Sequence, residues 1–436
     1  MRAQFGQILS RAKSQNKVIV LLLRTALYWL VKRWCQHEKK RESKMKSSIS
    51  MMTRISTFLS PNKVILGNGA TSQVGKEAKS LGAKKALIAT DEGVSKAGLV
   101  EGVEKSLKSE KIDVGIFDKV KAEPPARLVD ECAQMAQSKG YDIIIGIGGG
   151  SSLDVAKGAS IIATNKRSIL NYVGINIVPR PGLNKILLPT TAGSGSEVTR
   201  GIVITDEADN SKKVVFSDFA LANVAIVDPL LTISMPPVIT TDTGMDALVH
   251  AIEAYVSANA TPFSDILAIE AIRLIAENLP VAYAKADNLE ARFNMALAAT
   301  LGGMAFVSGG LGAVHALAYS LGTEYHLPHG RTNAVMLPHV VNYNKIGNLK
   351  KYADIAQAME ENIEGLSTYQ AAEKLVISLN RLLETLRIPT KLSAYGISKE
   401  DIPKLVEGAM KQSRLFVPNP RNLTEEDVKN IYAGAF

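Results

Sequence analysis

Short apolar runs alternate with longer amphipathic segments over about residues 62–228, and this alternation most narrows the folds open to the chain. Segments such as 99–109 and 125–138 have the pattern of helices. Between the helical segments, six runs have the length and the Val- and Ile-rich composition of strands: 63–66, 86–90, 114–117, 143–147, 186–189 and 224–227. Such an alternation predicts a mostly parallel sheet that is covered by helices on both faces.

The pattern changes after Pro229. Residues 240–436 contain long segments with a 3.6-residue period, such as 265–277, 289–300 and 369–386, and no convincing strand. Pro236 and Pro237 mark the expected boundary. We therefore predict an α/β N-terminal domain over residues 52–235 and an all-α C-terminal domain over residues 236–436.

The positive charge of the chain is confined to its first fifty residues. The net charge is +9, but residues 1–50 hold twelve Lys and Arg against two Glu, which leaves 39 basic and 40 acidic residues in the rest. The high pI is therefore no sign of a nucleic-acid partner. Only two cysteines are present, Cys35 and Cys132, which fits a reducing cytoplasm and excludes a disulfide framework.

Residues 1–51 are expected to be a basic extension outside the catalytic fold. Their apolar run, 18–31, is broken by Arg24 and is too short to span a bilayer comfortably. Lys32 and Arg33 follow it where a signal peptide would carry small residues. An interfacial helix is one interpretation, and a translation start at Met51 or Met52 is the favoured one. Deleting residues 1–50 should leave the kinetics unchanged.

Four side chains have the spacing of a metal site. Asp246 and His250 are four residues apart in a helical segment, so they project from one face, and His315 and His329 follow further along. Carboxylate and neutral imidazole suit Fe(II), Zn(II), Mn(II) or Ni(II). The alternative is a set of ordinary buried histidines. Asp246 weakens it, because a carboxylate in such an apolar stretch needs a partner to be buried.

Two loops at strand ends have the composition of a phosphate-binding site. The strand 143–147 runs into Gly148, Gly149, Gly150 and Ser151 and then into a helix, and residues 190–196 add hydroxyls and glycines after the strand 186–189. Ligands of open α/β sheets bind at such strand ends. Asp91, after the strand 86–90, is a candidate partner for ribose hydroxyls and would repel a 2′-phosphate, which favours NAD over NADP. Tight turns and helix caps are the alternative for each loop alone.

Together these motifs resemble the iron-containing (group III) alcohol dehydrogenase family over residues 55–436. The resemblance rests on 148–151, on 189–194, on the helix 244–255 and on His329-Gly330 with 333–339. It implies the architecture shared with dehydroquinate synthase, in which substrate lies between a dinucleotide-binding domain and a helical metal-binding domain. The implied catalytic and metal residues are Asp246, His250, His315 and His329. The implied cofactor contacts are Asp91, Gly149, Gly150, Ser151, Asp154, Thr190, Thr191, Ser194, Val203 and, across a one-residue insertion, Lys213. Where several members of the family have a second histidine, four residues after the third ligand, this chain has Tyr319.

The resemblance implies an NAD- and metal-dependent oxidoreductase that interconverts a short-chain primary alcohol, a diol or an anionic hydroxy compound with its aldehyde. Fe(II) is the expected ion, with Zn(II) or Mn(II) as alternatives, and a cytoplasmic homo-oligomer is expected. The rival functions are an NAD- and metal-dependent lyase like dehydroquinate synthase, and a membrane-tethered binding protein without catalysis. Ser308, Gly309 and Gly310 predict a roomy substrate wall. His326 and Arg331 flank His329 and could hold an anionic substrate, although a solvated loop or a phosphate contact would explain them equally well.

Overall fold

A computed structural model describes residues 55–209 and 211–436, and Phe58–Phe436 forms one unit. The expectations for the basic extension concern residues that lie almost entirely outside the described part, so they stay predictions. The division into two domains at residue 236 also stays a prediction.

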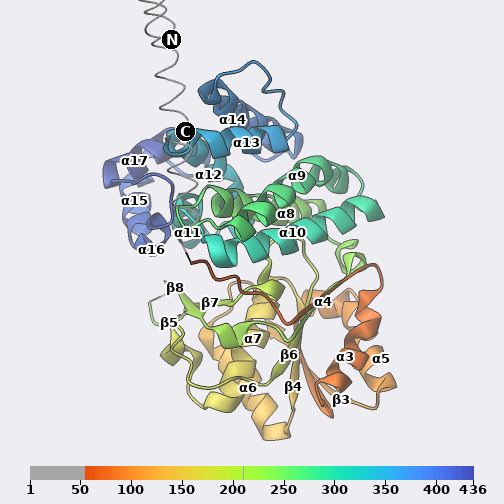
Figure 1. The fold of residues 1–436 in the computed structure, drawn as a ribbon. Coiled ribbons are helices and arrows are strands. Elements are labelled where there is room, and N and C mark those ends of the chain that lie inside the picture. Colours follow the sequence, from red (N-terminus) through yellow and green to blue (C-terminus); the bar gives the residue numbers. More distant parts are fainter. Residues whose placement is uncertain (1–54, 210) are drawn as a thin grey trace, which may run out of the picture. The chain divides into compact units, whose positions relative to one another are not determined.

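A six-stranded parallel sheet forms the centre of the first half of the unit (Figure 1). The six predicted strands are all confirmed, and their order is β1-β9-β6-β4-β2-β3. They are β1 (Lys63–Leu66), β2 (Lys85–Asp91), β3 (Asp113–Val120), β4 (Ile143–Gly148), β6 (Asn184–Pro189) and β9 (Val224–Val227). Because Gly148 of β4 pairs with Pro189 of β6, the two glycine-rich loops start side by side.

Helices cover both faces of this sheet. The helices α3 (Val74–Ser80) and α5 (Leu99–Ser109) pack on one face, and α6 (Ala126–Lys139) and α7 (Gly150–Asn165) pack on the other. Successive side chains of a strand point to opposite faces, so Ile143 and Ile145 enter the core under α3 and α5, while Ile144 enters the core under α6 and α7. The uninterrupted apolar sequence of β4 follows from burial on both sides.

A second, smaller sheet was not predicted from the sequence. It consists of β5 (Gly174–Ile175), β8 (Ser211–Phe216) and β7 (Gly201–Asp206), of which β7 and β8 are antiparallel. The polar start of β8, with Ser211, Lys212 and Lys213, has the composition of a loop. One face of this sheet lines the cavity described below.

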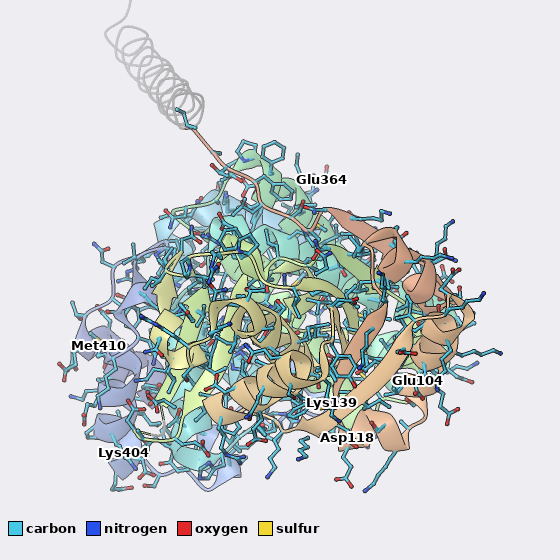
Figure 2. All side chains as sticks on the ribbon, turned by 90° about the horizontal axis from the view of Figure 1, so that it is seen from below. Glu104, Asp118, Lys139, Glu364, Lys404 and Met410 are labelled. Carbon is cyan, nitrogen blue, oxygen red and sulfur yellow. The ribbon has the colours of Figure 1, made fainter. Side chains whose placement is uncertain are left out.

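Helices form the second half of the unit, and the described residues after Pro237 include no strand. The helix α8 (Pro237–Val256) is buried along most of its length because α9 (Pro262–Ala284), α10 (Leu289–Gly309) and α12 (His329–Asn344) pack around it. The remaining helices are α11 (Ala313–Tyr325), α13 (Leu349–Ala358), α14 (Thr368–Thr385), α15 (Ile402–Met410), α16 (Ser413–Phe416) and α17 (Glu425–Ala433). Charged side chains such as Asp118, Lys139 and Lys404 lie on the outside (Figure 2).

Within residues 55–209 and 211–436, no single helix combines the length and the hydropathy of a membrane span. Only α10 and α11 taken together pass that test, by length and composition, and they are bent by 107° where they meet.

Candidate active site

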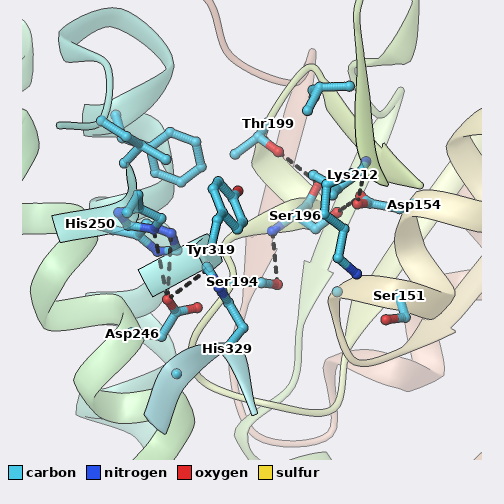
Figure 3. A pocket seen from close by; sticks show the side chains of 18 of the residues that line it. Ser151, Asp154, Ser194, Ser196, Thr199, Lys212, Asp246, His250, Tyr319 and His329 are labelled. Atoms are coloured by element: carbon cyan, nitrogen blue, oxygen red, sulfur yellow. Dashed lines mark hydrogen bonds and ion pairs between the residues drawn. The ribbon is translucent and has the colours of Figure 1, made fainter. Parts of the chain in front are cut away.

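A cavity of about 590 Å³ lies between the carboxyl edge of the large sheet and the helices α8, α10, α11 and α12. Its walls bring together the glycine-rich loops, one face of β7 and β8, and the predicted metal ligands. Figure 3 shows Asp246, His250 and His329 on one side and Ser151, Asp154 and Lys212 on the other. The strand-end position predicted for the site is therefore where the cavity lies.

The four predicted ligands gather around one atom of this cavity, Asp246 Oδ1. Asp246 Oδ1 lies 3.8 Å from His250 Nε2, 3.9 Å from His315 Nε2 and 3.6 Å from His329 Nε2. The ligand atoms of Asp246, His315 and His329 all lie within 4.8 Å of one another. These three residues form a group that could hold a metal ion, and His250 adds a further imidazole beside Asp246. Carboxylate and imidazole ligands suit a divalent ion such as Fe(II), Zn(II) or Mn(II).

Glu253 fixes the orientation of His315, a role that the sequence analysis did not assign. Its Oε2 lies 2.6 Å from His315 Nδ1, so Nε2 is the nitrogen left to face Asp246. The same carboxylate accepts hydrogen bonds from the backbone N–H groups of Gly312 and Val314. The sequence signal was a carboxylate on the Asp246 helix, two turns further along, in an otherwise apolar segment.

Burial sets the protonation of this cluster. It lowers the pKa of His315 and of His250, which keeps both imidazoles neutral. Burial alone would raise the pKa of Asp246, but the neighbouring histidines and Asn333 hold it below its ordinary value. Burial raises the pKa of Glu253 to about 7. Neutral imidazole and ionised carboxylate are the forms that bind metal.

We expect Glu253→Gln to lower metal affinity about 10- to 100-fold, as losses around a metal ligand usually do. Both carboxylate oxygens of Glu253 accept hydrogen bonds, but a glutamine side chain has only one acceptor oxygen. Its NH2 group cannot accept, and it would have to face a backbone N–H or the His315 ring. Titration of the purified variant with Fe(II) or Zn(II) measures the affinity. An unchanged dissociation constant would contradict this role of Glu253.

The predicted cofactor residues divide into two groups. Those that line the cavity are Gly149, Gly150, Ser151, Asp154, Thr191, Ser194 and Val203. Gly150 is the first residue of α7, and a Cβ atom there would lie 2.9 Å from both Cβ and Oγ of Ser194. The close approach of the two loops thus requires glycine at this position, and it leaves the free N–H groups of α7 facing the cavity.

Asp154 supports the cavity wall rather than presenting a free carboxylate. It accepts hydrogen bonds from Ser196 Oγ at 2.6 Å and from the Val203 backbone at 2.9 Å, and its Oδ1 lies 3.0 Å from Lys157 Nζ. Lys157 is fully buried and also donates to the carbonyl groups of Ser196 and Gly201. This network fixes the segment that leads into β7.

Asp91, Thr190 and Lys213 are not among the lining residues. Asp91 caps α4 (Glu92–Lys96) by accepting from the Val94 backbone, and it accepts a second bond from Ser152 Oγ at 3.0 Å. Lys213 Nζ instead lies 2.6 Å from Asp209 Oδ2. Alternate residues of a strand face opposite sides, so Lys212, not Lys213, reaches the cavity with Val214 and Phe216.

The expectation that Arg331 and His326 add charge to the substrate wall is wrong. Arg331 Nε donates to Asp242 Oδ1 at 2.6 Å, and neither residue lines the cavity. His326 is exposed at the end of α11, with a left-handed φ of 54°. Tyr319 does line the cavity, and its ring stacks on His329 with centroids 5.1 Å apart. Burial raises the pKa of Tyr319, so its hydroxyl stays protonated at neutral pH.

Comparisons with known proteins agree with this geometry. Residues 61–229 match the family described as iron-containing alcohol dehydrogenase, and residues 240–436 match its C-terminal part. A 1,3-propanediol dehydrogenase of Klebsiella pneumoniae is 44% identical over 88% of this chain and 100% of its own length. A sulfoacetaldehyde reductase of Bilophila wadsworthia is 37% identical over 86% of this chain and 97% of its own. The crystal structure of a 1,3-propanediol oxidoreductase superposes with a TM-score of 0.86 at 44% identity, over 88% of this chain and all of that one.

These matches span nearly all of the described residues and come from oxidoreductases. They do not favour a lyase or a binding protein without catalysis. The chain belongs to the iron-containing alcohol dehydrogenase family.

Proposed function

We propose that this protein uses NAD and a divalent ion, with Fe(II) as the expected ion, to interconvert primary alcohols and aldehydes in this cavity. The observation that carries the proposal is the position of Asp246 and three histidine Nε2 atoms in the same cavity as the loop Gly149–Ser151. An oxidoreductase of this kind needs the two binding sites to be this close, because hydride passes directly between carbon atoms.

Asp246, His250, His315 and His329 would hold the ion, which supplies a Lewis acid for the oxygen of the alcohol or aldehyde. The free N–H groups at the start of α7 and the hydroxyls of Ser151, Thr191 and Ser194 would bind the pyrophosphate and orient the nicotinamide ring. We assign Lys212, in place of Lys213, to the cofactor side of the cavity. Apolar side chains such as Phe306 and Leu311 exclude water from the reacting carbon.

Several members of the family have a histidine at the position that corresponds to Tyr319 of this chain. The proton must therefore follow a route here that does not use that histidine. Tyr319 stays protonated, so it can donate a hydrogen bond to substrate or to a ribose hydroxyl but is a poor base at neutral pH. We propose that the proton leaves through ribose hydroxyls and water. A homo-oligomeric state and a cytoplasmic location stay predictions from the sequence.

The test of the proposed function is metal analysis of the purified protein together with NADH absorbance during reaction with a panel of C2–C4 aldehydes, diols and anionic aldehydes. Full metal content and net oxidation of NADH are expected. A protein that binds metal and NAD but consumes no net NADH would support the lyase instead. The panel would also identify the substrate class, since the relatives include dehydrogenases named for propanediol, methanol and long-chain alcohols.

We expect the enzyme to prefer NAD to NADP, and Asp91→Asn to shift the ratio of the two activities toward NADP by about 10- to 100-fold. A carboxylate close to a 2′-phosphate costs several kcal/mol, and Asp91 Oδ2 would lie 3.2 Å from a Cβ atom at Gly148, beside the cofactor loop. Kinetics with both cofactors measure the ratio.

The asparagine variant separates charge from structure. Asparagine caps a helix about as well as aspartate, so the α4 cap survives and the melting temperature should stay close to that of the wild type. Asp91→Gly should show the same change of cofactor. A wild-type preference for NADP, or an unchanged ratio in Asp91→Asn, would show that Asp91 does not select the cofactor.

A further inference from the structure

Three cationic side chains line the cavity, and they differ in their partners. Arg200 Nη1 lies 2.7 Å from Asp218 Oδ1, and Lys212 Nζ lies 3.0 Å from Glu123 Oε2. Arg414, in the short helix α16, is in no ion pair with any carboxylate of residues 55–209 or 211–436. Its charge is therefore available to a ligand.

Two aromatic contacts place the guanidinium of Arg414 in the cavity. Its guanidinium carbon lies 5.8 Å from the centroid of the Phe216 ring on β8. It is also close enough to Tyr319, which lines the same cavity, to lower the pKa of the Tyr319 hydroxyl against the effect of burial. Tyr319 in turn stacks on His329, one of the four ligands. Arg414 is thus one aromatic side chain away from the metal ligands, although it reaches the cavity from a segment 85 residues further along the chain.

The wall near Arg414 is apolar and has room for a short chain. Phe306 packs against the His250 ring with centroids 4.6 Å apart, and Val307, Leu311, Leu415 and Pro418 continue the wall. Gly201 and Gly310 line the cavity without side chains. A substrate with its reacting carbon at the ligand cluster would have an apolar passage along its chain and a cation beside it.

We propose that Arg414 binds an anionic group at the far end of the substrate, so that the enzyme favours aldehydes with a terminal carboxylate or sulfonate over neutral aldehydes of the same length. This inference rests on the proposed function. A guanidinium presents a planar fork that matches either anion bidentately. Reduction moves a hydride from NADH to the carbonyl carbon and a proton from water to the oxygen, so the anionic tail is unchanged.

The test compares matched aldehydes on the full-length, metal-loaded enzyme. Butanal and 4-oxobutanoate have the same chain length and differ in the terminal carboxylate, and sulfoacetaldehyde against propanal makes the same comparison for a sulfonate. The variants are Arg414→Met, which keeps the length without the charge, and Arg414→Lys, which keeps the charge without the fork. Lys411→Met is the control, because Lys411 is exposed, pairs with Glu407 and does not line the cavity.

For the wild type we expect a higher kcat/KM on the anionic member of at least one pair. Arg414→Met should lower that preference by about 10- to 100-fold, mainly through KM, which is the effect of losing a bond between charged groups. The preference of Arg414→Lys for the anionic aldehyde should lie between those of the wild type and Arg414→Met. Lys411→Met should keep the wild-type preference.

Three outcomes would overturn the proposal: a wild type that favours the neutral aldehydes, equal losses of Arg414→Met on both members of a pair, or a rise in the KM for NADH with every substrate. The last would place Arg414 on the cofactor. A wild type that oxidises NADH with butanal but shows no preference refutes this inference and leaves the proposed function standing. Failure with all four aldehydes at full metal content refutes both.

Discussion

Replacing Asp246 or His250 by alanine is expected to lower turnover by at least about a thousandfold, with loss of bound metal and with the fold retained. Polarisation of the substrate oxygen by a metal is worth several kcal/mol, and each 1.36 kcal/mol is about a factor of ten in rate. Asp246 is the centre of the cluster, because its Oδ1 lies within 4 Å of all three Nε2 atoms. Without it, the three histidines remain with no carboxylate among the predicted ligands to balance the charge of an ion.

Metal analysis, circular dichroism and steady-state kinetics on the same preparation measure the three parts of this prediction. His339→Ala is the matched control, because His339 lies on α12 with His329 but is not among the cavity residues. That variant should keep its metal. An Asp246→Ala protein with full metal content and normal turnover would show that the ion is held elsewhere.

The large sheet could be predicted from the sequence because burial on both faces leaves a strong pattern. Each of its strands contains a short apolar run. The inner strand β4 is apolar throughout, whereas the edge strand β3 also holds Asp113, Asp118 and Lys119. The small sheet could not, because β8 faces the cavity on one side and begins with Ser211, Lys212 and Lys213. Polar residues in a cavity wall have the same composition as residues in a solvated loop, and only the pairing of β8 with β7 distinguishes the two.

The candidate site also has residues that could be predicted from the sequence and residues that could not. Asp246 and His250 could be paired from their spacing alone, since residues four apart lie on one helix face. Spacing was not used in the same way for Arg331. It was expected near the substrate only because it is close to His329 in the sequence. Two residues along a helix correspond to a rotation of about 200°, so Arg331 points away from His329 and binds Asp242. Arg414 reaches the cavity through tertiary packing, for which the sequence carries no local signal.

The contact between α8 and α12 is so close that one methyl group should disrupt the ligand cluster. Gly330 follows His329 at the start of α12, and a Cβ atom there would lie 2.1 Å from the Asp242 carbonyl oxygen and 2.6 Å from its carbonyl carbon. Both are backbone atoms of α8, the helix that carries Asp246 and His250. A side chain could rotate away, but here the two helices have to separate.

Gly330→Ala is therefore expected to move His329 away from Asp246 and to lower metal affinity and turnover at least about 100-fold, since misplacement by an ångström is enough for a loss of that size. Overpacking of this kind usually also costs about 1–3 kcal/mol of stability. Gly102→Ala is the control, because a Cβ atom there meets only Thr71 Cγ2 at 3.5 Å, an ordinary contact, and it should keep full metal content. All four ligands remain in Gly330→Ala, so excess Fe(II) or Zn(II) should restore part of the turnover, which it could not do in Asp246→Ala. A Gly330→Ala enzyme with the metal affinity of the wild type would mean that α12 can shift without displacing His329, and that the cluster tolerates more movement than the contact with Asp242 implies.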